Sequence, residues 1–201
     1  TREREFELEW AFHDHHSDRD LRRLQTMQLV ADCRGESTAR EIAELADLGA
    51  TYIQMDEVPL AMLCDPEIQA RVNALGMDAD DLVDIYIEAI NDAVGGRPTG
   101  MSCGLHLCRG NFKGKFLSKG GYEPVAERLF NNLQVDSFFL EYDTERAGDF
   151  KPLRLVPDDK HIILGIVSSK LSELETIEYL CRRINDAAKF VPVSYTHLTL
   201  P

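Results

Sequence analysis

The alternation of strand-like and helix-like segments from about residue 37 onward is the feature that most constrains this fold. Strands are predicted at 51–56, 100–108, 138–143 and 161–167, with helical patterns before and between them. Strands separated by helices through short connections indicate a parallel sheet with right-handed crossovers. Because a complete (β/α)8 barrel takes roughly 250 residues and eight strands, these four strands predict an α/β fold that is a partial TIM barrel, about half complete.

Capping patterns predict where two of the helices begin. Thr38 is followed by Glu41, and Ser172 by Glu175, the spacing at which two side chains satisfy free backbone N–H groups of the first helical turn. Asp65-Pro66 predicts a further helix start. From Ser172, the last helix would bury an apolar stripe made of Leu174, Ile177, Cys181, Ile184 and Ala188.

Composition limits the classes of partner. The chain has 201 residues, 44% of them hydrophobic, and a net charge of −13 without a compensating Lys/Arg cluster. Nucleic-acid phosphates require a basic face, so nucleic acid is not expected as a partner. No apolar run approaches the roughly 18 residues that span a bilayer, so no membrane partner is expected either. The charged start, Thr1–Glu5, lacks the apolar region of a signal peptide.

The cysteines suit a reducing compartment. Their number is odd and their spacing shows no disulfide framework, which favours free or metal-bound thiols and a cytoplasmic location. They are Cys33, Cys64, Cys103, Cys108 and Cys181. We interpret all of these but Cys33 and Cys108 as structural, with Cys103 and Cys181 in the core.

The two ends differ from the middle of the chain. Residues 1–36 have no clean period and carry a His13/His15/His16 cluster, so we interpret them as out of frame or disordered. Residues 194–201 resemble translated sequencing-adapter text, and we interpret them as an artefactual tail. Residues 37–193 would then form one domain, the partial barrel. Its apolar sheet edge is expected to be open, at Val135, Phe138, Leu140, Ile162 and Leu164.

Polar residues follow three of the predicted strands. They are Asp56-Glu57, the pair His106 and Cys108, and Glu141, at the strand ends where barrel enzymes carry their active sites. Residues two apart on a strand point to the same face, so His106 and Cys108 would form half of a tetrahedral zinc site. The alternatives are a buried core pair for His106/Cys108, a surface carboxylate for Glu141, and a cap of the next segment for Asp56 or Glu57. For Glu57 we favour the cap.

Four stretches in order resemble the catalytic barrel of the cobalamin-independent methionine synthase family, in its shorter bacterial-type homologues. They are Gly49–Glu57, His106–Phe112, Gly120–Ala126 and Leu164–Lys170. The resemblance implies a TIM barrel with a catalytic Zn2+. It also implies methyl transfer from 5-methyltetrahydrofolate, a methylated folate with a polyglutamate tail, to the thiol of homocysteine, giving methionine.

By position, the resemblance makes His106, Cys108 and Glu141 the zinc ligands and Asp56 the residue that holds the amino group of homocysteine. The family also uses a later cysteine ligand, which this sequence lacks. Ser168 and its neighbours could contact substrate carboxylates, or could form a plain loop. The cations of 109–119 could attract a folate tail, or could be solvated. They are Arg109, Lys113, Lys115 and Lys119.

The chemistry requires these residue types. A free thiol is mostly protonated near neutral pH, and zinc coordination converts it to the nucleophilic thiolate. A general acid is also needed to protonate the leaving nitrogen, and the sequence does not identify it.

Two other functions stay open. The first is alkyl transfer to another small thiol on the same fold. The second is a catalytically inactive truncated barrel, which the missing cysteine and the expected open sheet edge favour. A relative of uroporphyrinogen decarboxylase would use no zinc, so His106 and Cys108 argue against it. The oligomeric state is not predicted.

Overall fold

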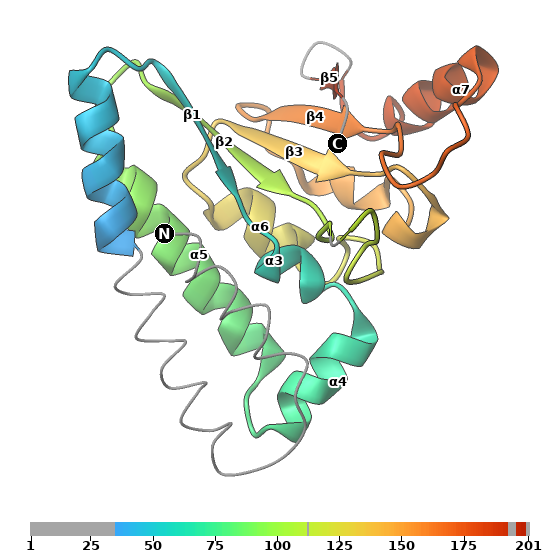
Figure 1. Ribbon diagram of the computed structural model, residues 1–201, viewed down its shortest axis with the longest axis horizontal. Coiled ribbons are helices and arrows are strands. Elements are labelled where there is room, and N and C mark those ends of the chain that lie inside the picture. Colours follow the sequence, from blue (N-terminus) through green and yellow to red (C-terminus); the bar gives the residue numbers. More distant parts are fainter. Residues whose placement is uncertain (1–34, 112, 193–195, 200–201) are drawn as a thin grey trace.

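A five-stranded parallel sheet forms the centre of the computed structural model, which describes residues 35–111, 113–192 and 196–199 (Figure 1). The strands lie in the order of the sequence, and every neighbouring pair is parallel. Consecutive parallel strands joined by helical crossovers are the arrangement of a (β/α)8 barrel, so the predicted α/β partial barrel is confirmed. The strands are β1 (Tyr52–Asp56), β2 (Ser102–Leu107), β3 (Ser137–Glu141), β4 (His161–Gly165) and β5 (Thr196–Thr199).

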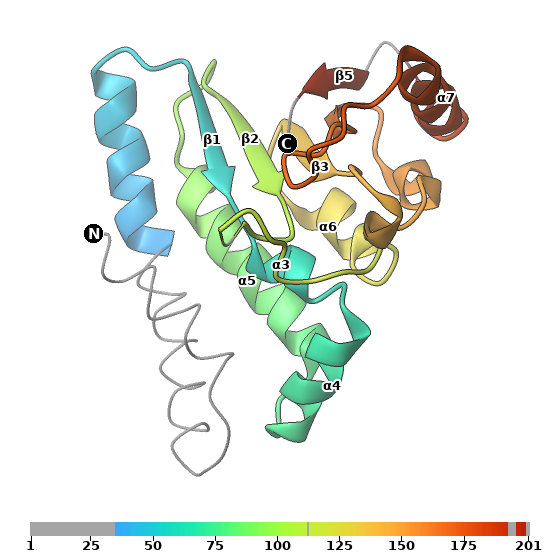
Figure 2. The same ribbon diagram turned by 45° about the vertical axis from the view of Figure 1, so that its right-hand side comes forward.

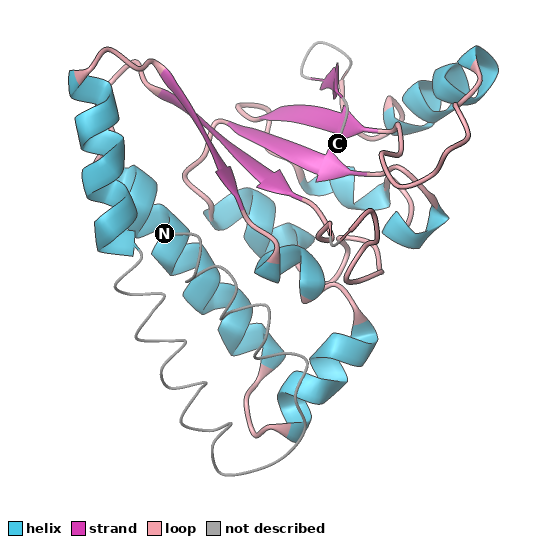
Figure 3. Ribbon diagram, viewed as in Figure 1, coloured by secondary structure: helices cyan, strands magenta, loops and turns pink. Residues whose placement is uncertain are grey.

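Helices pack against one face of this sheet. Figures 1 and 2 show α5 and α6 beneath β1, β2 and β3, and Figure 3 shows the same layering by type of structure. A further helix covers 35–47 and lies beside α5. The other α-helices are α3 (Pro59–Met62), α4 (Pro66–Ala74), α5 (Ala79–Gly95), α6 (Ala126–Asn132) and α7 (Ile177–Ala187). Two 3-10 turns, η1 (Glu145–Ala147) and η2 (Lys151–Leu155), follow β3.

The core lies between the sheet and these helices. Alternate residues of a strand point to the same face, and the helix-facing set includes Cys103, Leu105 and Leu107 of β2, all fully buried. The expectation of an open apolar sheet edge was wrong, because the five residues are at most 1% exposed and belong to this core. They are Val135, Phe138, Leu140, Ile162 and Leu164. The core position predicted for Cys103 is confirmed.

The predicted start of the last helix was also wrong. The helix begins at Ile177, where the Thr176 hydroxyl oxygen accepts the N–H of Tyr179 at 3.2 Å. The Glu175 carboxylate instead accepts the N–H of Ser168 at 2.8 Å. Both capping-box predictions fail, since the helix over 35–47 is already formed before Thr38.

The buried face of α7 also differs from the predicted one. Leu174 is 91% exposed, Ile177 is 76% exposed, and Cys181 is exposed, so the predicted core stripe lies largely on the surface. A helix advances about 100° per residue, and the face that packs on the core is one residue away from the predicted one. It carries Leu180, Ile184 and Ala187.

Two other local predictions are confirmed. The Asp65 carboxylate accepts the N–H of Glu67 at 2.9 Å and begins α4. The Glu57 carboxylate accepts the N–H of Leu60 at 3.1 Å, which caps α3. Glu57 therefore acts as the cap that the sequence favoured.

The two end segments that differ from the middle of the chain are only partly described. Residues 1–34, with the histidine cluster, lie outside the described residues. The backbone of β5, within the stretch interpreted as an artefactual tail, pairs in parallel with β4 from Ile162↔Thr196 to Gly165↔Thr199. It takes the position of the next barrel strand, and the interpretation of 194–201 as an artefact stays a prediction. In the described residues, no helix has the length and apolar character needed to cross a membrane.

Candidate functional site

The carboxyl ends of β1, β2 and β3 meet at one edge of the sheet. Asp56 pairs in register with His106, and Leu107 pairs with Leu140. The next residues are Cys108, directly after the end of β2, and Glu141, the last residue of β3. The backbone brings the predicted strand-end residues to one edge, as expected for parallel strands.

Asp56 lies on the sheet face opposite to the helices and is exposed. The Gln54 amide donates to its carboxylate at 3.2 Å, and the Tyr52 hydroxyl lies 3.5 Å from the Gln54 oxygen. These three side chains alternate along β1 and so share one face. Asp56 is thus an accessible carboxylate with an oriented neighbour.

The Cys108 thiol is half-buried at the same edge. Burial is the main cause that raises its pKa above the usual value, and the charges of Glu141 and Asp56 raise it further, against a lowering by the Gly110 backbone and by Lys170. A charge shifts the pKa of a neighbouring group only over a short distance. Cys108, Glu141, Asp56 and Lys170 therefore share one local environment. A raised pKa also means that the thiol is protonated near neutral pH and a poor nucleophile without an activating partner.

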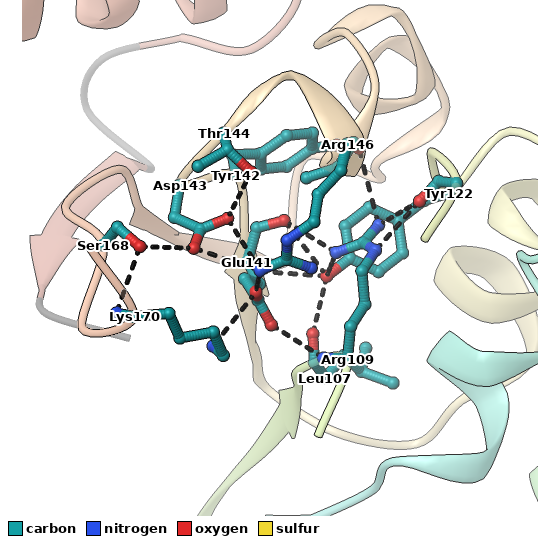
Figure 4. Close-up of polar contacts among 12 residues, drawn as sticks. Leu107, Arg109, Tyr122, Glu141, Tyr142, Asp143, Thr144, Arg146, Ser168 and Lys170 are labelled. Atoms are coloured by element: carbon teal, nitrogen blue, oxygen red, sulfur yellow. Dashed lines mark hydrogen bonds and ion pairs between the residues drawn. The ribbon is translucent and has the colours of Figure 1, made fainter. Parts of the chain in front are cut away.

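Glu141 is a fully buried carboxylate (Figure 4). One of its oxygens accepts the backbone N–H of Arg109 at 2.7 Å. The other pairs with the Arg146 guanidinium and with Lys170 Nζ at 3.3 Å. Burial pushes the pKa of Glu141 up, but these donors and cations outweigh it, and the pKa is lowered. The alternative that Glu141 is a solvated surface carboxylate is therefore wrong.

A second buried carboxylate, Asp143, extends this cluster. Both of its oxygens lie 3.1 Å from Arg146 Nη2, and one accepts the Ser168 hydroxyl at 2.9 Å. Ser168 Oγ also accepts the N–H of Lys170 at 3.2 Å. The cluster joins the loops after β3 and β4, as Figure 4 shows. Ser168 uses its hydroxyl within the protein here, so its contact with substrate stays a prediction.

Arg109 is fully buried, so neither a solvated loop nor a folate-tail site describes it. Its guanidinium donates to the carbonyl oxygens of Gly120 and Glu141, each at 2.9 Å, and to the Tyr122 hydroxyl at 3.1 Å. It also stacks 4.4 Å from the centre of the Tyr122 ring. Sequence reasoning missed this role because burial depends on the loop that closes over the residue. The remaining cations of this loop, Lys113, Lys115 and Lys119, are exposed.

Tyr122 is a second residue that the sequence did not identify. Its hydroxyl donates to the Leu107 carbonyl at 2.6 Å and accepts the N–H of Glu141 at 2.9 Å. Tyr122 and Arg109 therefore bind the ends of β2 and β3 together just behind the predicted ligands. The only sequence signal was the position of Tyr122 in a Gly-Gly-Tyr turn.

Imidazole, thiolate and carboxylate are donors that suit zinc. Among the described residues, however, no three His, Cys, Asp or Glu side chains are gathered closely enough to hold a metal ion. The two oxygens of Glu141 are held by Arg109, Arg146 and Lys170. The donor chemistry at this edge fits zinc, and zinc ligation by His106, Cys108 and Glu141 stays a prediction.

Comparison with known proteins gives a resemblance at the level of a family. No family model matches the chain. The chain is 42% identical over 153 residues to the uncharacterized protein YxjH of Bacillus subtilis, covering 76% of this chain and 41% of YxjH. It is 26% identical over 190 residues to a methionine synthase of Pyrococcus abyssi, covering 94% of this chain and 45% of that protein.

Solved structures agree with this resemblance. A Listeria monocytogenes protein, named as a candidate vitamin-B12-independent methionine synthase, superposes with a TM-score of 0.68 at 32% identity, over 88% of this chain and 49% of that one. A B12-independent methionine synthase from Shewanella sp. W3-18-1 gives a TM-score of 0.60 at 22% identity, over 92% of this chain and 49% of that one, and supports the fold alone. The chain spans less than half the length of each of these relatives. Three of these four relatives are named as methionine synthases, one of them as a candidate.

Proposed function

We propose that this chain is part of a zinc-dependent enzyme that transfers a methyl group from 5-methyltetrahydrofolate to the thiol of homocysteine, giving methionine. The observation that carries the proposal is the meeting of Asp56, His106, Cys108 and Glu141 at one strand edge, in a chain similar to methionine synthases. The cysteines of the described residues are free thiols, which fits a reducing cytoplasm.

His106, Cys108 and Glu141 would hold the metal. Bound zinc would supply a Lewis acid that converts the substrate thiol to a thiolate. The raised pKa of the Cys108 thiol also implies that metal binding releases a proton there.

Asp56 would bind the ammonium group of homocysteine. An exposed carboxylate at the same edge as the thiol site can form a charge-assisted hydrogen bond with a primary ammonium. The Gln54 amide at 3.2 Å would hold the carboxylate in one orientation. This contact would fix which end of the amino acid faces the metal.

Metal content tests the site. Purified chain should carry close to one zinc per chain, and Cys108→Ser should lose it. Cys181→Ser is the matched control, because Cys181 is an exposed thiol on α7. Zinc retained in Cys108→Ser would contradict the site.

Substrate binding tests the reaction. In chain loaded with Co2+, homocysteine should change the thiolate-to-cobalt absorption band, and Asp56→Asn should weaken this binding. The matched thiol that lacks only the amino group, 4-mercaptobutyrate, should bind the wild-type chain and Asp56→Asn equally. If Asp56→Asn weakened the binding of both thiols equally, the role of Asp56 would be contradicted. Tighter binding of another small thiol than of homocysteine would favour alkyl transfer to that acceptor.

A further inference from the structure

We infer that Tyr52 is a positioning residue that orients the Asp56 carboxylate through Gln54, and that Gly104 leaves the space in which the Tyr52 hydroxyl lies. The inference deepens the proposed function and rests on it, because it takes Asp56 as the group that binds the ammonium of the substrate. It makes the beginning of β1 part of the site that selects an amino acid.

The first support is a row of three polar side chains on β1. Tyr52, Gln54 and Asp56 alternate along the strand and so point to one face. The Tyr52 hydroxyl donates to Gln54 Oε1 at 3.5 Å, and Gln54 Nε2 donates to Asp56 at 3.2 Å. A side-chain amide has an acceptor oxygen and a donor NH2 group, so a donor at its oxygen turns the NH2 group toward the carboxylate. Tyr52 therefore favours the orientation of Gln54 that binds Asp56.

The second support is the glycine that β2 places beside this row. Gly104 is buried and pairs in register with Gln54. A Cβ atom at Gly104 would lie 2.6 Å from the Tyr52 hydroxyl oxygen and 2.7 Å from Cε2 of Phe139. Glycine inside a strand often marks such a close approach. Any larger residue would displace the hydroxyl, so the position of Tyr52 depends on Gly104.

The third support is that little else restrains Asp56. Its side chain is exposed, and in the described part of the chain its carboxylate has one hydrogen-bond donor, Gln54, and no cation. Glu141, in contrast, is held by three residues. A carboxylate that is ordered before the ligand arrives loses less entropy on binding. The contact with Gln54 therefore prepares Asp56 for a charge-assisted hydrogen bond with an ammonium group.

The inference predicts an effect that depends on the amino group of the ligand. If Tyr52 acts through Asp56, loss of its hydroxyl weakens the binding of ligands that carry an ammonium group. Ligands without that group are unaffected. A tyrosine that only supports the fold would alter the binding of both kinds of ligand or of neither.

The test compares methionine, the proposed product, with 4-(methylthio)butanoate, which lacks only the amino group. Neither ligand has a free thiol, and both affinities are measured by titration calorimetry. We expect Tyr52→Phe to weaken methionine binding about fivefold, as for the loss of one hydrogen bond, and to leave the binding of 4-(methylthio)butanoate unchanged. Tyr179→Phe is the matched control, because it removes a tyrosine hydroxyl from α7, and it should change neither affinity.

Gly104→Ala tests the same connection from the neighbouring strand. Its methyl group would displace the Tyr52 hydroxyl, so methionine binding should weaken by about the same factor as in Tyr52→Phe. In the double variant the two losses should not add, because both substitutions break one contact. Additive losses would overturn the role of Gly104. If Gly104→Ala does not fold, Tyr52→Leu takes its place and should match Tyr52→Phe.

Asp56→Asn separates this inference from the proposed function. It should abolish the preference of the wild-type chain for methionine over 4-(methylthio)butanoate. If it does so and Tyr52→Phe leaves methionine binding unchanged, the role of Tyr52 is overturned and Asp56 keeps its role. Equal weakening of both ligands by Tyr52→Phe overturns the role of Tyr52 as well. If folded wild-type chain binds methionine no better than 4-(methylthio)butanoate, the proposed role of Asp56 is wrong, and this inference is overturned with it.

Discussion

The backbone N–H of Arg109 donates to the Glu141 carboxylate at 2.7 Å, and the Arg109 guanidinium donates to the Glu141 carbonyl at 2.9 Å. One residue at the end of β2 therefore holds both the side chain and the backbone of the residue that ends β3. Both residues are buried. This connection fixes the spacing of the two strand ends that carry the predicted zinc ligands.

Arg109→Met should destabilise the chain strongly. The variant leaves the carbonyl oxygens of Gly120 and Glu141 and the Tyr122 hydroxyl with fewer partners in a buried place. We expect the free energy of unfolding to fall by about 3 kcal/mol, measured by urea denaturation. Lys115→Met, an exposed cation of the same loop, should change it by less than about 0.5 kcal/mol. Equal effects of the two substitutions would contradict the structural role of Arg109.

Glu141→Gln should change how stability depends on pH. The pKa of Glu141 is lowered from 4.5 in the folded chain, so its ionised form stabilises the fold above that pH. This stabilisation is lost as the pH falls through the folded-state pKa. In metal-free chain, the variant should be less stable than wild type at neutral pH, and the difference should shrink below pH 4.5. Urea denaturation across this range measures the effect. A difference that stays constant with pH would oppose it, and Glu88→Gln on the exposed side of α5 is the control.

The cysteines should react with iodoacetamide in an order set by burial. Burial raises the pKa of the Cys64 thiol to about 12 and that of Cys103 to about 11, and both side chains are inaccessible. Of the four cysteines in the described residues, Cys181 is exposed and should be modified first, and Cys108 should follow more slowly because it is half-buried. Mass spectrometry of the individual peptides over time gives the order. In denaturant the four rates should converge, and rapid labelling of Cys64 in folded chain would refute the packing around it.

Gly120→Ala should be far more damaging than Gly114→Ala. Both glycines have positive φ, +108° and +77°, so alanine is strained at each, at a cost of about 1–2 kcal/mol. A Cβ atom at Gly114 would have no atom within 4 Å, whereas one at Gly120 would overlap the backbone carbonyl of Cys64. The Cys64 backbone cannot shift as easily as the end of a flexible side chain. We therefore expect about 2 kcal/mol of further destabilisation in Gly120→Ala. Thermal unfolding of the two variants measures the difference, and equal losses would argue against this close approach.

Local patterns in the sequence were sufficient to predict the order of the strands, two helix caps and one core residue. The apolar runs that became β1 to β4, the caps at Glu57 and Asp65, and the buried position of Cys103 all depend on residues close in sequence. The meeting of Asp56, His106 and Glu141 at one edge followed from the parallel strands. These features are predictable because strand periodicity and cap spacing act over a few residues.

Only the tertiary structure decided which groups contact Glu141 and which face of α7 is buried. The partners of Glu141 come from the end of β2, from η1 and from the loop after β4, and no local pattern links them. The buried face of α7 carries Leu180, Ile184 and Ala187 because those side chains meet the core, which the local apolar pattern did not indicate. Burial and charge pairing are properties of segments brought together from distant parts of the chain. The sequence therefore determined which residues reach the site, and the packing of loops over the strand ends determined what those residues bind.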